Sequence, residues 1–492
     1  MPLDQDLATH LTDARLLKTD GYVDGAWASA TGGARFAVTN PATGATIAEV
    51  ADMGAGETRC AVEAAHIAWK PWEGRTAKER GAALRRWCEL MMANQEDLAR
   101  IATAECGKPL AEARGEVAYA ASFLEWFAEE AKRAYGDVIP THQTDKRILV
   151  LKQAVGVVGA ITPWNFPIAM ITRKVAPAIA VGCPVVVKPA EQTPLSALAL
   201  AELAERAGIP RGVFNVVVGL DGPAIGEVLT GDDRVRKIAF TGSTEVGRIL
   251  MSASAASIKN VSLELGGNAP FIVFDDADID AAVEGAIVCK FRNAGQTCVC
   301  ANRIYAQEGV YDAFVEKLAA RVATLTVGDG AEPGVEVGPL IEQAGVEKVR
   351  DHIADAKSKG ARVAVGGAPH AAGPLFFEPT VLCDVTPEMK VAREETFGPL
   401  APVFRFKDEA DAIAQANATE FGLAAYFYAR DLGRVWRVSE GLEYGMVAVN
   451  SGILSTEVAP FGGMKQSGLG REGSKYGLDS FTEIKYVLMG GV

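Results

Sequence analysis

The chain has 492 residues, 49% apolar and 23% charged, a balance that predicts a globular protein of about two to four domains. Its net charge of -13 argues against broad binding to nucleic acid or to anionic membranes, although a local basic pocket can still hold a small anion. The N-terminal stretch lacks a basic start followed by an apolar block, and prolines and a glycine interrupt the most apolar segment. We therefore expect a cytoplasmic protein whose cysteines are reduced.

The pattern of apolar residues changes along the chain. Residues 57–135 carry apolar side chains at helical spacing, whereas from about residue 150 short apolar runs alternate with helical segments. Thr193 predicts a helix start with a capping hydroxyl, Pro194 fits the first turn, and Gly208 fits the end. A second alternating block follows over about 271–450. The sequence thus predicts an α/β fold with two doubly wound domains and a ligand cleft between them.

Cys298 lies in the loop FRNAGQTCVC, after an expected helix. A thiol acts as a nucleophile where its surroundings favour the thiolate, and Arg292 in the same segment can supply positive charge. The alternative is a buried cysteine that only packs, which is the commoner environment for this residue. The spacing of the cysteines and histidines is not typical of a metal site, so no metal is expected.

Glu264 in LELGGNAP and Asn165 in the turn PWNFP are further candidate catalytic residues. Apolar surroundings raise the pKa of a carboxyl group and suit a general base, whereas a glutamate that faces water at a strand end has no such role. The amide of Asn165 can donate to a developing oxyanion, or PWNFP can be only a rigid turn.

Two segments have features of a nucleotide site. Lys188 ends an expected strand, where a ribose or phosphate would lie. Gly242 and Ser243 stand between a strand and a helix, where free N–H groups can hold phosphate, although such turns are common. The Gly-rich segment 461–477 is expected to be a surface loop.

Seven segments stand in one order along the chain: PWNFP, VVVKPAEQTP, FTGSTEVG, LELGGNAP, GQTC, EETFGP and PFGGMKQSG. Together they resemble the aldehyde dehydrogenase superfamily, and the resemblance covers nearly the whole chain. It implies a homodimer or homotetramer with four parts: a nucleotide-binding domain over 1–131 and 152–263, a catalytic domain over 264–450, a β oligomerisation element over 132–151 and 471–492, and a substrate-pocket loop over 451–470.

The resemblance also implies roles. Cys298 would attack the aldehyde, Asn165 and the Cys298 N–H would hold the oxyanion, and Glu264 would activate the water that hydrolyses the thioester. CoA-acylating relatives typically lack this glutamate, so the expected product is a free acid. The expected cofactor is NAD, with NADP as the alternative, because a carboxylate at position 191 can bind the ribose 2′-hydroxyl and would repel a 2′-phosphate. The implied cofactor residues are Trp164, Lys188, Glu191, Gly242, Ser243, Glu395 and Phe397.

In more detail the chain resembles the succinate-semialdehyde branch of this superfamily. Arg173, Arg292 and Ser455 would then bind the distal carboxylate of the substrate, unless the two arginines pair with protein carboxylates. Thr456 is adjacent to Ser455 and makes that assignment less secure. Glutarate semialdehyde, a broad range of aldehydes and a non-catalytic role are the alternatives. A further hypothesis is that oxidation joins Cys300 to Cys298 and switches the enzyme off; the alternative is that Cys300 is only a packing residue.

Overall fold

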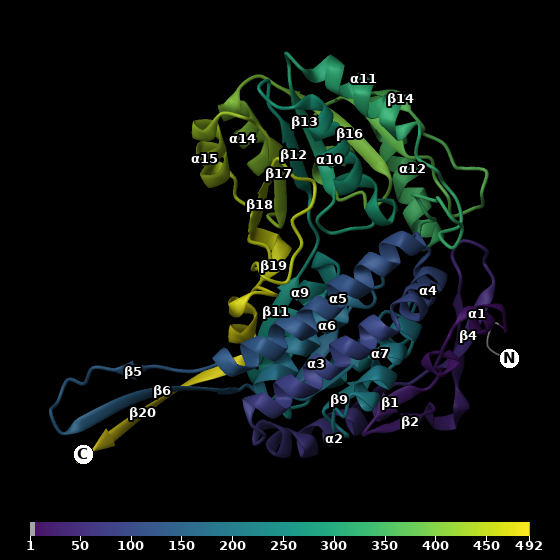
Figure 1. The fold of residues 1–492 in the computed structure, drawn as a ribbon. Helices are drawn as coiled ribbons and strands as arrows, with labels where there is room; N and C mark the ends of the chain where they lie inside the picture. Colours follow the sequence, from purple (N-terminus) through teal and green to yellow (C-terminus); the bar gives the residue numbers. More distant parts are fainter. Residues whose placement is uncertain (1–4, 492) are drawn as a thin grey trace.

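The computed structural model describes residues 5–491. Residues 1–4 and residue 492 lie outside this range, so the prediction about the N-terminal stretch falls partly outside the described residues. Two α/β lobes lie one above the other, and a long β arm projects from the lower lobe (Figure 1). The hydrophobic core of the lower lobe runs along the chain to Leu265 and also includes Leu478 and Phe481, and that of the upper lobe begins at Ala269. The predicted α/β fold with two doubly wound domains and a small β element is confirmed.

The lower lobe contains an eight-stranded sheet in the order β19-β11-β10-β7-β8-β9-β1-β2. The five strands from β11 to β9 are parallel, and β19, β1 and β2 pair antiparallel at the edges. The central strands are almost wholly apolar because helices cover both faces of a parallel sheet. The strands are β1 Gly21–Val23, β2 Ala26–Ala28, β7 Val157–Ile161, β8 Val185–Lys188, β9 Phe214–Val216, β10 Val235–Thr241, β11 Asn260–Glu264 and β19 Gly468–Leu469.

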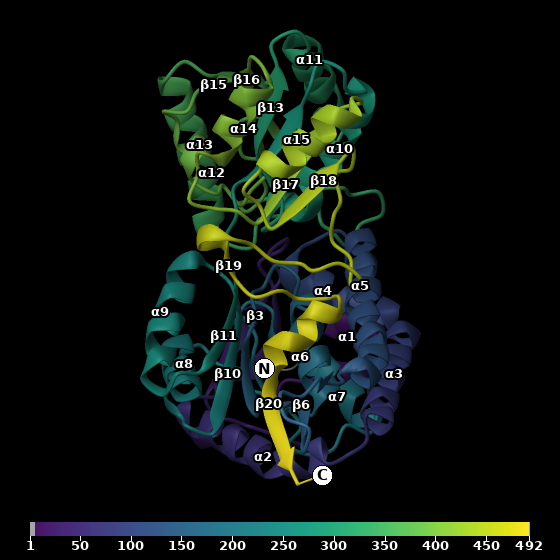
Figure 2. The same ribbon diagram turned by 90° about the vertical axis from the view of Figure 1, so that its left-hand side faces the viewer.

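Helices α8 and α9 cover one face of this sheet, and α6 and α7 cover the other, with α3 and α5 outside them (Figure 2). Residues 55–130 are almost entirely helical, as predicted. The helices of this lobe are α1 Gln5–His10, α2 Ala55–Glu73, α3 Ala77–Ala93, α4 Gln95–Cys106, α5 Leu110–Glu130, α6 Ala169–Val181, α7 Pro194–Arg206, α8 Gly222–Gly231 and α9 Thr244–Ser254.

The start of α7 corrects one prediction. The helix begins at Pro194, and Gly208 adopts the left-handed conformation after its end with φ +83°, but Thr193 makes no capping hydrogen bond. Instead, the carboxylate of Glu105 on α4 accepts the N–H groups of Leu195 and Ser196, both at 2.8 Å. A carboxylate from a packed neighbour satisfies two free N–H groups at once, and a single hydroxyl cannot do this.

The upper lobe contains a seven-stranded sheet in the order β14-β15-β16-β13-β12-β17-β18, parallel except for β14. Its strands are β12 Ala269–Val273, β13 Ala301–Gln307, β14 Arg362–Val365, β15 Thr380–Val385, β16 Leu400–Phe406, β17 Ala424–Tyr428 and β18 Met446–Val449. Its helices are α10 Ile279–Phe291, α11 Tyr311–Val322, α12 Gln343–Ser358, α13 Lys390–Arg393, α14 Glu409–Asn417 and α15 Leu432–Gly441. No helix in the described part of the chain has the length and apolar character to cross a membrane.

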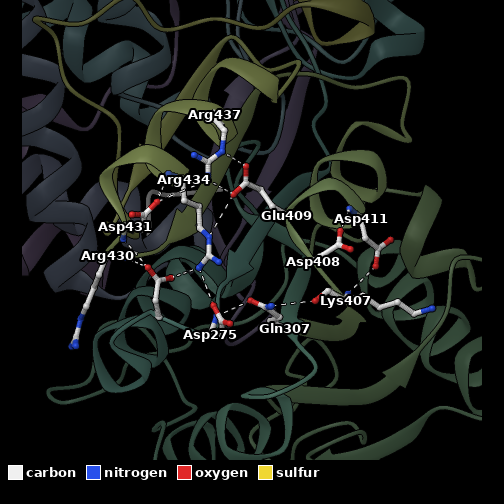
Figure 3. Close-up of polar contacts among 11 residues, drawn as sticks. Asp275, Gln307, Lys407, Asp408, Glu409, Asp411, Arg430, Asp431, Arg434 and Arg437 are labelled. Atoms are coloured by element: carbon white, nitrogen blue, oxygen red, sulfur yellow. Dashed lines mark hydrogen bonds and ion pairs between the residues drawn. The ribbon is translucent and has the colours of Figure 1, made fainter.

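Ion pairs fasten α14 and α15 to one end of this sheet. Arg434 of α15 lies between Asp275, at 2.9 Å, and Glu409 of α14, at 3.6 Å (Figure 3). Its guanidinium also lies 4.7 Å from the ring centre of Phe274. Arg437 donates to Glu409 at 2.6 Å, but its side chain is mostly exposed, so its pair contributes little stability. Arg434 is thus the central cation of a cluster that lies outside the cavity described below.

The arm is a three-stranded antiparallel sheet of β5 (Val138–Ile139), β6 (Lys146–Ala154) and β20 (Thr482–Gly490). β6 and β20 pair over nine residues each, from Thr482 opposite Ala154 to Gly490 opposite Lys146. The arm exposes large apolar side chains, among them Val138, Ile484 and Tyr486. A separate hairpin joins β3 (Arg35–Thr39) and β4 (Thr46–Ala51).

Candidate active site

A cavity of about 260 Å³ is lined by segments from both lobes. Helices α5 and α6 form one wall, the loop before β13 contributes Cys298 and Arg292, and the C-terminal segment contributes Ser455 and Phe461. The structure thus brings together Cys298, Arg173, Arg292 and Ser455, which lie up to 282 residues apart in the sequence. Thr456 does not line this cavity; its hydroxyl is 3.2 Å from the carboxylate of Glu457.

The loop that leads to Cys298 has an unusual backbone. Asn293, Ala294 and Gly295 all have positive φ, at 50°, 55° and 77°. A Cβ atom at position 295 would lie 2.2 Å from the carbonyl oxygen of Gly398, so only glycine fits this contact. The N–H of Asn293 donates to the carboxylate of Glu112 at 2.8 Å. Backbone strain of this kind persists only where neighbours hold it, and it is common at functional sites.

Burial raises the pKa of the Cys298 thiol to about 12, and the nearby positive charge of Arg173 opposes this rise. The carboxylates of Glu395 and Glu264 raise the pKa further, and Arg292 lowers it. The thiol is therefore protonated at neutral pH in this state. A reaction through Cys298 requires that its proton leave as the sulfur attacks.

Glu264 ends β11 and is only 4% exposed, so it does not face water as an ordinary strand-end glutamate would. Burial raises the pKa of its carboxyl group well above the usual value, and the negative charge of Glu472 raises it further. Its Oε2 atom has no hydrogen-bond partner among residues 5–491. A carboxyl group in this setting is a strong base once ionised.

The turn that carries Asn165 is held on several sides. Its carbonyl oxygen accepts from the ammonium of Lys108 at 2.6 Å and from the amide of Asn293 at 3.0 Å. The side-chain amide of Asn165 donates to the carbonyl of Gln296 at 3.0 Å, two residues before Cys298. The amide therefore lies beside the nucleophile loop, where an oxyanion formed at Cys298 would need a donor.

The two arginines of the cavity differ in their partners. Arg173 is 2% exposed and pairs with the carboxylate of Glu472 at 2.7 Å, and its guanidinium lies 3.8 Å from the ring centre of Phe461. Arg292 forms no ion pair within the described part of the chain, and its guanidinium lies 5.1 Å from the ring centre of Phe166. The alternative of an internal ion pair thus holds for Arg173 and not for Arg292.

The Gly-rich segment 461–477 is only in part the surface loop that the sequence predicts: residues 464–466, 469–470 and 475–476 are exposed, and most of the others are buried. Ser467 is fully buried, and its hydroxyl donates to the carbonyl of Gly266 at 2.8 Å and accepts from the N–H of Gly422 at 2.9 Å. Glu472 is 6% exposed and accepts from both Arg173 and Lys174. Its buried residues contact both lobes, since Ser467 bonds to Gly266 and Gly422 and Glu472 bonds to α6. No local signal identifies Glu472, since its partners lie nearly 300 residues away.

The ends of β8 and β10 in the lower lobe carry the residues that the sequence predicts for an adenosine group. Lys188 at the end of β8 pairs with Glu191 at 2.8 Å, and a Cβ atom at Gly222 would lie 3.8 Å from its ammonium. Ser243 caps α9, because its hydroxyl accepts from the N–H of Val246 at 3.3 Å. Gly242 precedes this cap, and its N–H donates to the carbonyl of Glu264 at 3.1 Å. The ion pair lies at the carboxyl end of a parallel strand and Ser243 at a helix start, which are the two features on which the sequence prediction rests.

Glu395, which the sequence predicts for the nicotinamide ribose, is held at the start of the segment after Glu264. One carboxylate oxygen of Glu395 accepts from the N–H of Gly267 at 3.1 Å, and burial raises the pKa of this group to about 7. A Cβ atom at Gly266 would lie 3.0 Å from the other oxygen and 3.4 Å from the hydroxyl of Thr244. That hydroxyl is buried without a partner among the described residues. Phe397 packs edge-to-face on Trp164, with ring centres 5.6 Å apart.

Cys300 is buried in the structure and points away from solvent. Its sulfur lies 3.3 Å from the ammonium of Lys290 and donates to the carbonyl of the same residue at 3.4 Å. Burial raises the pKa of the Cys300 thiol, and the positive charge of Lys290 opposes this rise. The eight cysteines are all free.

The sequence matches the aldehyde dehydrogenase family over residues 27–487. It is 66% identical to the glutarate-semialdehyde dehydrogenase of Pseudomonas aeruginosa, over 98% of this chain and 100% of that protein. It is 64% identical to the NADP(+) succinate-semialdehyde dehydrogenase GabD of Escherichia coli, over 98% of this chain and 99% of that protein. The crystal structure of an E. coli NADP-dependent enzyme is also 64% identical in sequence and matches with a TM-score of 0.97. The match covers 98% of this chain and 100% of the chain in that structure. These matches confirm the resemblance seen in the sequence, and the chain belongs to the aldehyde dehydrogenase family.

Proposed function

We propose that this enzyme oxidises an aldehyde with a distal carboxylate to the corresponding diacid, with succinate semialdehyde as the first candidate and glutarate semialdehyde as the second. The observation that carries the proposal is the unpaired guanidinium of Arg292 in the same cavity as Cys298. Arg173 adds positive charge, and Ser455 adds a neutral donor. The two relatives described above are named as a glutarate-semialdehyde dehydrogenase and a succinate-semialdehyde dehydrogenase, which supports both candidates.

The residues of the site support one sequence of steps. The thiol of Cys298 releases its proton to solvent as the sulfur attacks the aldehyde carbon, and the amide of Asn165 with the Cys298 N–H stabilises the resulting alkoxide. When bound, a nicotinamide nucleotide supplies the hydride acceptor. The acyl group then remains on Cys298 as a thioester. Glu264 takes a proton from a water molecule that attacks the thioester carbonyl, which releases the acid and restores the thiol.

We propose NAD as the preferred cofactor and NADP as the alternative. Lys188 and Glu191 would hold the adenosine ribose, and Gly242 and Ser243 would border the pyrophosphate. Glu395, Phe397 and Trp164 would border the nicotinamide half. The carboxylate of Glu191 favours a cofactor with a free 2′-hydroxyl, which is NAD. The E. coli relative and the E. coli crystal structure are both named as NADP enzymes, which favours NADP.

The first test compares succinate semialdehyde, glutarate semialdehyde, propanal and benzaldehyde in steady-state assays with NAD and with NADP. We expect kcat/KM to be highest for the two semialdehydes, and Arg292→Gln should lower it for succinate semialdehyde about 30-fold, because a desolvated charge loses its partner. Arg405→Gln, an exposed arginine of the upper lobe, is the control. Equal turnover of the uncharged aldehydes by the parent enzyme would leave an aldehyde dehydrogenase of another specificity. The NAD and NADP arms of the same assay decide the cofactor.

We propose that oxidation joins Cys298 and Cys300 and reversibly inactivates the enzyme. The ammonium of Lys290, 3.3 Å from the Cys300 sulfur, supports this, because its positive charge offsets part of the rise that burial causes in the pKa of the thiol. Peroxide should inactivate the parent enzyme, and dithiothreitol should restore most of its activity. In Cys300→Ala the loss should be largely irreversible, since the Cys298 sulfur then oxidises further. Full recovery of the variant would show that Cys300 has no such role.

We also propose that the lower lobe binds the cofactor, the upper lobe carries the nucleophile, and the arm joins subunits into a homodimer or homotetramer. The apolar side chains on β20 support this assignment of the arm. Light scattering of the intact chain distinguishes the two oligomers, and a monomer would contradict both. A cytoplasmic location fits the eight free cysteines, and fractionation of the source cells tests it.

A further inference from the structure

Tyr119 is a polar residue of the cavity that has no role in the steps above. It lies on α5 and lines the cavity together with Cys298, Arg292 and Ser455. Its hydroxyl is buried and has no hydrogen-bond partner within residues 5–491. Because most buried hydroxyl groups in proteins are hydrogen-bonded, one without a partner in a binding cavity marks a place for a ligand atom.

The surroundings of Tyr119 hold its ring in place. The ring packs edge-to-face on Phe123, with centres 5.1 Å apart. The hydroxyl oxygen of Ser122 lies 2.8 Å from the carbonyl oxygen of Tyr119 and 3.2 Å from the carboxylate of Glu457, so its single hydrogen is shared between these two acceptors. Glu457 is two residues from Ser455, so this contact fastens the segment that carries Ser455 to the turn of α5 that carries Tyr119. The two hydroxyls therefore border the cavity from adjacent, connected walls.

The charges around Tyr119 make its hydroxyl a donor. Burial raises the pKa of the phenol; the positive charges of Arg173 and Arg292 oppose this rise, and the negative charge of Glu472 adds to it. The phenol thus stays neutral at physiological pH and keeps its proton. It also feels both guanidinium groups, which places it in the positive part of the cavity.

We propose that Tyr119 is a specificity-determining residue whose hydroxyl donates to the distal carboxylate of the substrate, beside Arg292 and Ser455. This inference rests on the proposed function. A carboxylate has about four lone-pair positions. The forked guanidinium of Arg292 can fill two of them, and the two hydroxyls can fill one each. An uncharged aldehyde leaves both hydroxyls without a partner, and a site built to bind a polar group rejects such analogues strongly.

The test is Tyr119→Phe, which removes only the hydroxyl oxygen. We expect the ratio of kcat/KM for succinate semialdehyde to that for butanal to fall about tenfold, the order expected for one hydrogen bond to a charged group. The melting temperature should not fall, because the hydroxyl has no partner in the protein to lose. The matched control is Tyr135→Phe, since Tyr135 is 74% exposed and lies outside the cavity.

Arg292→Gln, measured in the same assay, separates this inference from the proposed function. If Arg292→Gln lowers the ratio and Tyr119→Phe does not, the role of Tyr119 is wrong and the carboxylate site stands. If neither variant changes the ratio, the proposed substrate class itself is wrong. A lower melting temperature with equal losses for both aldehydes would give Tyr119 a structural role and overturn the inference. The inhibition constant of glutarate, a dianion without an aldehyde, should rise about tenfold in Tyr119→Phe.

Discussion

Glu264→Gln should convert the enzyme into one that completes a single turnover and then stalls. The first turnover releases reduced nucleotide, and the steady-state rate that follows should be about 10²- to 10⁴-fold lower, because the general base for thioester hydrolysis is missing. Mass spectrometry should find an acyl group on the peptide that contains Cys298. Stability should not decrease, since the neutral amide resembles the protonated carboxyl group that burial favours at this position.

The pH dependence of kcat provides a second measurement for this residue. Glu264 acts as a base only after it loses its proton, and its raised pKa moves that step to higher pH than for an ordinary glutamate. The steady-state rate should therefore rise with pH, and this dependence should be absent in Glu264→Gln. Glu420→Gln, at an exposed glutamate of the upper lobe that does not line the cavity, is the control. A first turnover that slows as much as the steady state would show that Glu264 acts on the thiol and not on water.

Asn165→Ala should slow the first turnover and the steady state together, by about 10²- to 10³-fold, because it removes a donor to the alkoxide on which the first step depends. The effect should be of similar size for succinate semialdehyde and for propanal, since the alkoxide is common to both. Stopped-flow measurement of the first turnover checks this. The contrast with Glu264→Gln, which spares the first turnover, separates the two roles.

The amide of Asn165 also bonds to the carbonyl of Gln296, so its loss can disturb the nucleophile loop. The rate at which iodoacetamide modifies Cys298 reports on that loop without any oxyanion. We expect this rate to change by less than about threefold in Asn165→Ala if the amide acts on the alkoxide. A large change in the alkylation rate, or a normal first turnover, would contradict the proposed role.

Sequence alone located the residues whose environment is set by their immediate neighbours. Glu264 follows an apolar strand, and Cys298 follows a helix and a short loop, so their elements could be predicted from local patterns. The fold class followed from the alternation of strands and helices in the same way. The order of the seven motifs then identified the family, which no single motif could do.

Features that depend on distant segments could not be predicted in this way. Thr193 stands at the position expected for a helix cap, yet it is the carboxylate of Glu105, from another helix, that accepts the free N–H groups at the start of α7. The Gly-rich C-terminal segment is polar like a surface loop, but part of it, including Ser467 and Glu472, is buried by contacts with distant segments. Glu472 holds Arg173 across 299 residues of sequence, and only the folded chain shows that this arginine is paired while Arg292 is not. Tyr119 has no motif at all.

The close contact between Gly295 and the carbonyl of Gly398 has a consequence for how this enzyme can evolve. It fixes the backbone that leads to Cys298 against the segment that follows Glu395, with no side chain between them. Mutations cannot adjust this spacing gradually, because even one added methyl group would clash. Helix α5 and the segment around Ser455 form other walls of the cavity, and their side chains can vary without moving that contact. A new substrate can therefore be acquired by changes in those walls, while the reacting centre is inherited as a unit.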